Sequence, residues 1–196
     1  MTKRHFGLLA ATLALLGTAG CGSEGYPLAD PVATATRLDG YTQTAYDALG
    51  LTGAALDDAW PGGGLEAEGW NCYSRDLADQ LSDSPPSEPG VVRVTDEWAV
   101  KGVSHARAVA ALRRARGELA AQGWEVTDFD DTPQRLHLEL EPPGSDDKVS
   151  VEEYPGGRLQ VGAYADCARY PEGTVLDAQG DPEVPEQRAP VQLRGE

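Results

Sequence analysis

The chain has 196 residues, the length of a single domain. It carries 16 Lys and Arg against 32 Asp and Glu, a formal net charge of −16. So acidic a chain lacks the cationic surface that nucleic-acid phosphates or anionic lipid headgroups require, which excludes nucleic-acid-binding proteins and polybasic membrane-surface proteins.

Residues 1–20 have the three-part pattern of a secretory signal peptide. Lys3 and Arg4 form a basic start, an apolar run extends from Phe6 to Leu16, and small residues follow. The apolar run is shorter than the roughly 20 residues needed to span a bilayer. A buried core helix is the alternative, but the segment has no polar face. We therefore expect this segment to be removed on export.

The signal ends in the sequence Thr-Ala-Gly-Cys at positions 18–21, which resembles a bacterial lipobox. The resemblance implies cleavage before Cys21 and lipidation of its thiol, and hence attachment to the extracytoplasmic face of the cell membrane. Thr18 stands where the motif prefers Leu, so cleavage by an ordinary signal peptidase stays open. Residues 21–38 contain small and polar residues and two prolines, and we expect them to form a flexible tether.

The expected processing also changes the charge of the protein. It removes Lys3 and Arg4 and no acidic residue, so 14 basic and 32 acidic side chains remain, a net charge of −18. An anionic lipid surface repels a body of this charge. We therefore expect the domain to stand off the membrane on its tether.

The odd number of cysteines, three, is explained if one of them is lipidated. Lipidation of Cys21 leaves Cys72 and Cys167, and export permits a disulfide between them. A bridge that closes a loop of about 100 residues contributes roughly 4.7 kcal/mol in the chain-entropy model. A free reactive thiol or a metal-binding pair is the alternative, although neither cysteine lies in a Cys-x-x-Cys motif or beside a histidine.

The first half of the domain contains one weak helical pattern and two strand patterns. Residues 40–58 have apolar residues at helical spacing, interrupted by two glycines. Period-two alternation predicts a strand over 65–75, with Cys72 on its apolar face, and another over 91–101. Asp96 falls among the apolar side chains of the second strand, which indicates a bulge or an edge position.

Residues 104–122 form the clearest predicted helix. Ser104 is a suitable N-cap, and Gly123 is a suitable C-terminal stop. Apolar residues recur at helical spacing, and arginines lie mostly on the other faces. We expect a solvated helix surface there, with an anion-binding face as the alternative. The arginines are Arg107, Arg113, Arg114 and Arg116.

After Gly123 the apolar period changes to two, which predicts strands. They are expected over 124–129, 135–141, 149–152 and 159–167. Short connections favour antiparallel neighbours. The predicted fold is an α+β two-layer sandwich, an antiparallel sheet of about five to six strands with one main helix on one face. The domain is expected over 39–171, followed by a disordered or loosely attached tail over 172–196.

The sequence identifies no catalytic, cofactor-binding or metal-binding residues. His105 and His137 lie outside recognisable catalytic motifs and are expected to be solvated. The cluster of Asp128, Asp130 and Asp131 lacks the glycine and the distal glutamate of a calcium loop, so we expect turn residues in water. The tryptophans could line a ligand groove, but in a chain with two Phe we expect them in the core. They are Trp60, Trp70, Trp98 and Trp124.

Over about 65–170 the chain resembles small uncharacterised lipoproteins of high-GC Gram-positive (actinobacterial) bacteria. The resemblance lies in Gly-Trp-Asn-Cys-Tyr at 69–73, Gln-Gly-Trp at 122–124 and Gly-Ala-Tyr-Ala-Asp-Cys at 162–167. It implies an envelope location and supplies no activity, no cofactor and no catalytic residues.

Three functions remain open at this stage. The first is a lipid-anchored envelope protein that binds a protein or small-molecule partner through its α+β domain. The second is an envelope hydrolase whose site is not recognisable from sequence, such as a pair of carboxylates. The third is a carrier with an apolar cavity between helix and sheet. A closed core would disfavour the carrier, whereas an open cleft with converging carboxylates and a histidine would favour the enzyme.

Overall fold

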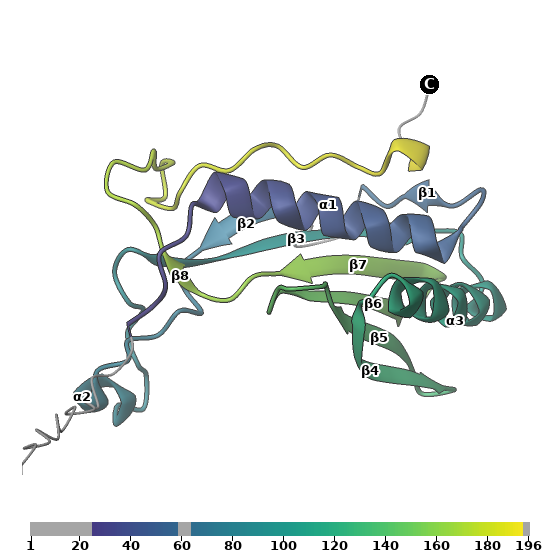
Figure 1. The fold of residues 1–196 in the computed structure, drawn as a ribbon, viewed down its shortest axis with the longest axis horizontal. Coiled ribbons are helices and arrows are strands. Elements are labelled where there is room, and N and C mark those ends of the chain that lie inside the picture. The colour runs from purple at the N-terminus through teal and green to yellow at the C-terminus, as the bar shows by residue number, and fades with distance from the viewer. Residues whose placement is uncertain (1–24, 59–63, 194–196) are drawn as a thin grey trace, which may run out of the picture.

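The computed structural model describes residues 25–58 and 64–193, and it confirms the predicted fold class. The fold is α+β in two layers, with long helices packed on one face of an antiparallel sheet (Figure 1). The expected signal peptide, Cys21 and Trp60 lie outside the described residues. No helix among the described residues has both the length and the apolar character to cross a bilayer.

The sheet has eight strands in the described part of the chain. The two that were not predicted, β1 and β8, have two residues each and pair with β3. The main order is β1-β3-β7-β6-β5-β4, and every strand pairing is antiparallel. The strands are β1 (Ala55–Leu56), β2 (Gly64–Glu68), β3 (Val91–Lys101), β4 (Glu125–Thr132), β5 (Arg135–Glu141), β6 (Lys148–Tyr154), β7 (Arg158–Tyr164) and β8 (Ala168–Arg169).

Strand β3 spans the predicted residues, but the bulge or edge expected at Asp96 is wrong. Asp96 pairs with Leu65 on one side and with Ala163 on the other, without a break in register. Its side chain is fully buried and faces the helices, where the hydroxyl of Thr42 donates to it at 2.6 Å and the amide of Gln187 donates as well. A buried carboxylate is tolerated here because both of its oxygens have donors.

Helix α1 (Pro31–Leu49) begins within the segment expected to be a tether, so that prediction is wrong from residue 31 onward. The helix predicted over 40–58 therefore starts and ends about nine residues earlier than expected. The Asp30 side chain caps the helix by accepting from a backbone N–H of the first turn, where proline is also favoured. Leu38 is fully buried against the sheet. Gly50, at φ 56°, ends the helix.

Helix α3 (His105–Ala121) agrees with its prediction within a residue at each end. Its arginines contact neighbouring elements of the fold. Arg113 forms an ion pair with Asp131 on β4 at 2.8 Å, and Arg116 lies 4.5 Å from the ring centroid of Phe129. These contacts fasten the helix surface to β4, and they occupy two of the arginines considered for an anion-binding face.

Fully buried aliphatic side chains fill the space between the two helices and the sheet. Leucines from α1, α3, β5 and β7 and valines from β6 and β7 all have no more than 2% of their surface exposed. They include Leu38, Leu49, Leu112, Leu119, Leu138, Leu140, Val149, Val151, Leu159 and Val161. In the described part of the chain, the space between the helices and the sheet is thus filled by side chains rather than left for an apolar cargo.

Strand β2 is shorter than the predicted 65–75 strand, and the chain beyond it forms a projecting lobe. We call residues 69–90 the β2–β3 lobe, which includes the short helix α2 (Leu77–Gln80) (Figure 1). Backbone bonds close its base, among them Glu88 N–H to the carbonyl of Cys72 at 2.7 Å. A disulfide joins Cys72 to Cys167, with Cα atoms 5.7 Å apart, and so ties the lobe to the chain beyond β7.

The C-terminal segment differs from the expected loose tail. Residues 172–193 return along the outer side of α1 and end in the short helix η1 (Val191–Leu193) (Figure 1). Val184 and Leu193 pack against the core. Gln187 donates to Asp96 and to the backbone carbonyl of Glu97, the latter at 2.8 Å. The described part of this segment is therefore attached to the domain.

Candidate ligand-binding site on the open sheet face

The face of the sheet opposite α1 and α3 carries polar side chains. In β3, Arg93, Thr95 and Glu97 alternate with the residues that face the core, and each of them is partly exposed. Strand β2 runs antiparallel beside them, so Glu66 lies opposite Thr95 and Glu68 lies opposite Arg93. Because alternate side chains of a strand point to the same face of the sheet, charged groups from both strands lie on one surface.

A hollow of about 380 Å³ lies on this face, at the end near the β2–β3 lobe. Strands β2, β3 and β7 supply its floor, and the first residues of the lobe supply its rim. The residues that line it are Glu66, Glu68, Trp70, Asn71, Arg93, Thr95, Glu97 and Tyr164. The volume lies in the range typical of small-ligand sites.

Tyr164 forms one wall of the hollow, and a glycine makes room for it. A Cβ at position 162 would collide with the ring and phenol oxygen of Tyr164, so the ring lies across Gly162. Burial raises the pKa of the Tyr164 phenol, and its hydrogen bond to Glu97 raises it further. The phenol therefore stays protonated and donates to the Glu97 carboxylate.

The hollow has more carboxylates than cations. Burial raises the pKa of Glu66, and the charge of the neighbouring Glu68 raises it further. Glu68 also accepts from the indole N–H of Trp70, whose side chain is 63% exposed at the rim. The Nε of Arg93 is buried without a hydrogen-bond partner. One guanidinium thus faces three carboxylates, and the hollow has acceptors and an aromatic ring available to a ligand.

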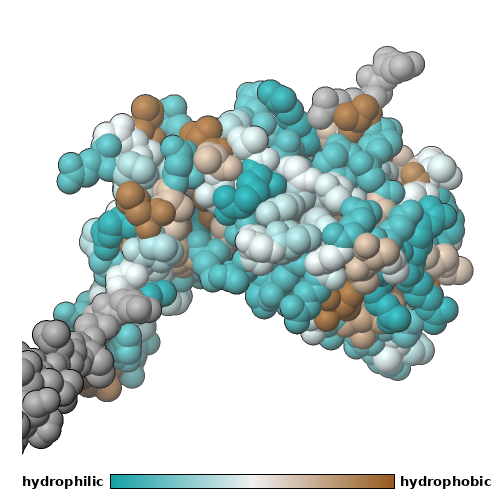
Figure 2. Space-filling model, viewed as in Figure 1, coloured by the Kyte–Doolittle hydropathy of each residue, from teal (hydrophilic) through white to brown (hydrophobic). Residues whose placement is uncertain are grey.

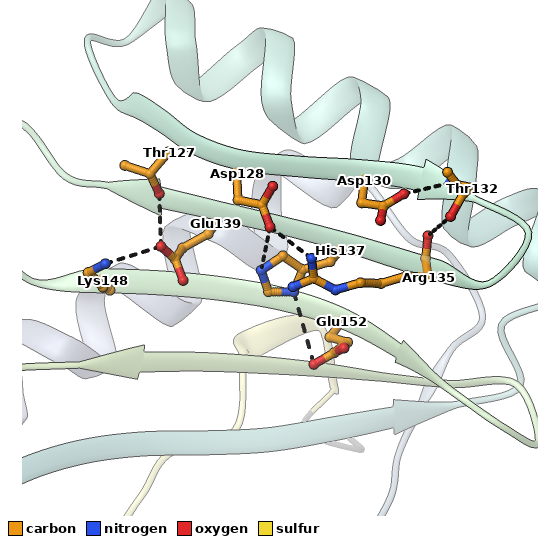
Figure 3. Close-up of polar contacts among 9 residues, drawn as sticks. All are labelled: Thr127, Asp128, Asp130, Thr132, Arg135, His137, Glu139, Lys148 and Glu152. Carbon is orange, nitrogen blue, oxygen red and sulfur yellow. Dashed lines mark hydrogen bonds and ion pairs between the residues drawn. The ribbon is translucent and has the colours of Figure 1, made fainter.

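A second polar cluster on the same face surrounds His137 on β5. Its Nε2 lies 3.8 Å from Asp128 on β4, and its Nδ1 lies 4.0 Å from Glu152 on β6 (Figure 3). Arg135 forms an ion pair with the same Asp128 oxygen at 2.9 Å. The His137 side chain is only 9% exposed, so the expectation of a solvated histidine is wrong.

The His137 cluster lacks the features of an acid–base site. A catalytic base needs a hydrogen bond to its orienting group and access to substrate. Both carboxylate distances exceed hydrogen-bond length, and His137 is not among the residues that line the hollow beside β2. The open cleft with converging carboxylates and a histidine, which would favour a hydrolase, is not formed by these groups.

The other residues considered from sequence take structural positions. His105 contacts Glu153 at 2.6 Å and links the first turn of α3 to β6. Asp128, Asp130 and Asp131 lie on strand β4 and not in a turn, and Asp130 accepts from the Thr132 backbone N–H at 3.0 Å. Trp98 and Trp124 are buried, as expected for core residues, whereas Trp70 is not. The expected pair Cys72 and Cys167 forms the disulfide.

A smaller hollow of about 230 Å³ lies beside the N-terminal half of α1. Val92 and Val94 form its apolar side, and Arg37 and Asp147 form an ion pair at 2.7 Å on its polar side. Its volume is below the usual range of ligand cavities. Together with the filled core, this disfavours a carrier of large apolar molecules.

Comparisons with known proteins give one structural similarity. No family model matches the chain, and no curated protein matches it. Among solved structures, the chain is similar to LppA of Mycobacterium tuberculosis, a candidate lipoprotein, with 12% sequence identity and a TM-score of 0.40. The match covers 76% of this chain and 87% of that one. Similarity at this level is too low to assign a function.

Proposed function

We propose that this chain is a lipid-anchored envelope protein that binds a small organic cation in the hollow beside β2. The anchor rests on the signal pattern and on the lipobox resemblance at Cys21. The cysteine count supports it, because the disulfide uses Cys72 and Cys167 and leaves Cys21 as the third cysteine. The ligand class rests on the composition of the hollow.

The excess of carboxylates over cations in the hollow carries the proposal. Glu66, Glu68 and Glu97 together exceed the single charge of Arg93, and the whole chain carries −16, so an anionic ligand is repelled. The exposed indole of Trp70 adds a π-face, to which ammonium groups bind. A diamine matches these features because it presents cations joined by an apolar chain.

The pH dependence of binding follows from Glu66. Its pKa lies above the usual carboxyl value because the side chain is partly buried and has Glu68 beside it. A cation binds the ionised form, so its binding releases the proton. We therefore expect affinity to increase as the pH rises through the raised pKa of Glu66, and then to level off.

Calorimetric titration of the mature domain with putrescine tests this function. Glu66→Gln should weaken binding about tenfold, the effect of roughly 1.4 kcal/mol, and Trp70→Ala should also weaken it. Glu118→Gln, which removes an exposed charge from α3, is the matched control and should bind as the wild type does. Absence of saturable binding, or equal affinities of the Glu66 and Glu118 variants, would contradict the proposal.

The anchor has a separate test. Mass spectrometry of the N-terminal peptide of the protein from its own cells should find Cys21 as the first residue, with a diacylglyceryl group on its sulfur. An unmodified Cys21, or cleavage at another position, would remove the lipid anchor from the proposal and leave the ligand site untouched.

A further inference from the structure

The β2–β3 lobe carries four exposed apolar or aromatic side chains, which we call the apolar cluster. Trp70, Tyr73, Leu77 and Leu81 are 63%, 46%, 73% and 80% exposed. The two leucines are four positions apart at the ends of α2, and neither belongs to the hydrophobic core. Large apolar side chains grouped on one surface mark a contact site more often than scattered ones do.

The start of the described chain is attached to this lobe. The phenol of Tyr26 donates to the backbone carbonyl of Tyr73 at 2.7 Å, and the guanidinium of Arg75 lies 4.0 Å from the centre of the Tyr26 ring. The backbone N–H of Arg169 also donates to the carbonyl of Pro27 at 2.8 Å. The chain that precedes residue 26 therefore departs from beside the lobe.

The distance from the proposed anchor to the lobe has an upper limit. Cys21 lies five residues before Tyr26, and a fully extended chain spans about 3.6 Å per residue, so the two are at most about 18 Å apart. Lipid attached to Cys21 therefore brings the bilayer surface close to the apolar cluster. A tether this short gives a high effective concentration, so a weak contact suffices.

We propose that the β2–β3 lobe rests on the lipid surface next to the anchor, with Leu77 and Leu81 in the interfacial region. The inference depends on the lipidation of Cys21 proposed above. Trp and Tyr favour the membrane interface because their rings have an apolar body and a polar group, and Trp70 and Tyr73 belong to the same cluster. Figure 2 shows a small brown area at the lower edge of the molecule beside the chain start, among teal and white residues.

Apolar contact, and not charge attraction, holds the lobe in place. The lobe has one basic residue, Arg75, and four acidic ones, a net charge of −3, so it suits a zwitterionic surface better than an anionic one. The acidic residues are Asp76, Asp79, Asp83 and Glu88. The inferred contact replaces the stand-off expected from net charge alone, because the apolar cluster lies on the side of the anchor.

The test uses the full mature chain, coupled through the Cys21 thiol to a maleimide lipid in phosphatidylcholine vesicles, with the disulfide intact. Brominated acyl chains should quench the fluorescence of Trp70, and Trp70→Phe identifies that component of the signal. The double variant Leu77→Ser, Leu81→Ser should lose at least half of the quenching. Both leucines are exposed, so the variant should fold, as circular dichroism can verify.

Val191→Ser is the matched control. Val191 is 65% exposed, and the adjacent Gln192 contacts Asp47, near the end of α1 that lies away from the lobe. This control should quench as the wild type does. Absence of Trp70 quenching in the coupled wild type, or equal quenching in the leucine variant, overturns the inference. Because coupling is chemical, these results are independent of whether cells lipidate Cys21, which mass spectrometry decides separately.

Discussion

Asp96 is fully buried, although aspartate side chains normally lie in water. It is a carboxylate in the layer between α1 and β3, fully buried, with Thr42 and Gln187 as donors. Burial raises its pKa, and the nearby charges of Asp39 and Glu97 raise it further. The folded protein therefore binds the Asp96 proton more tightly than the unfolded chain does.

Replacement of Asp96 by Asn should change the pH dependence of stability. For a carboxyl whose pKa is raised on folding, the stabilising effect is present at low pH and is lost as the pH rises from the unfolded to the folded pKa. Asp96→Asn removes this pH-dependent loss but also puts an amide N–H where one Asp96 oxygen accepts a hydrogen bond. Its free energy of unfolding should therefore change less between pH 4 and 8 than that of the wild type does. Urea unfolding between pH 4 and 8 measures the difference.

Asp146→Asn provides the comparison for that experiment, because Asp146 is exposed. Its stability curve should run parallel to that of the wild type across the pH range. If Asp96→Asn also runs parallel to the wild type, the buried carboxylate is not the source of the pH dependence.

The same residue shows the limit of sequence reasoning at this scale. Period two correctly placed Asp96 on the apolar face of β3. The donors that make this possible come from α1 and from the C-terminal segment, so no local pattern indicated them. The glutamates of the hollow could have been found, because Glu66 and Glu68 share a parity on β2 and Glu97 shares one with Arg93 on β3.

At the scale of elements, continuous patterns were predicted well. The alternation in β3 and the apolar spacing of α3, with a glycine after its end, gave bounds within a residue. Helix α1 was misplaced because small and polar residues such as Thr34 and Thr42 form part of its buried face, and because Pro31 suggested a tether. The lobe was missed because it is held by long-range contacts and not by a repeat.

The disulfide should matter most for the β2–β3 lobe. It joins residues 95 positions apart, and its loss is expected to lower the free energy of unfolding by roughly 2–5 kcal/mol. In the variant Cys72→Ala, Cys167→Ala, limited proteolysis should cut within residues 69–90 before it cuts the sheet, because the lobe projects from the sheet and then has only noncovalent contacts with the rest of the domain.

Wild-type protein treated with a reducing agent should give the same cleavage pattern as the double variant. Oxidised wild type serves as the resistant reference. Equal resistance of the lobe in all three samples would show that its backbone bonds alone, such as that between Glu88 and Cys72, are sufficient.

At the scale of the whole molecule, charge and apolar surface oppose each other near the membrane. The expected mature chain carries −18, while its exposed apolar cluster lies beside the proposed anchor. Whether charge repulsion or apolar contact dominates depends on the charge of the lipid surface and on the salt concentration. At 0.1 M salt the Debye length is about 10 Å, so charge repulsion acts only over that distance.

Anionic lipid should therefore weaken the contact of the lobe. For chain coupled through Cys21, replacement of part of the phosphatidylcholine by phosphatidylglycerol should reduce Trp70 quenching at low ionic strength, and 0.5 M NaCl should restore it. Neutral vesicles should show little dependence on salt. Stronger quenching on anionic vesicles would indicate that Arg75 drives the contact instead.

The position of α1 in the chain also affects how the domain assembles. Among the described residues, α1 precedes all the long strands in the sequence, yet it packs on β3 and on β7, which ends at Tyr164. Until β7 has emerged, the side chains of Leu38 and Leu49 have no complete surface to cover them, so the apolar face of the nascent helix is available to chaperones. A chain truncated before β7 should therefore be a substrate for proteolysis rather than a smaller folded protein.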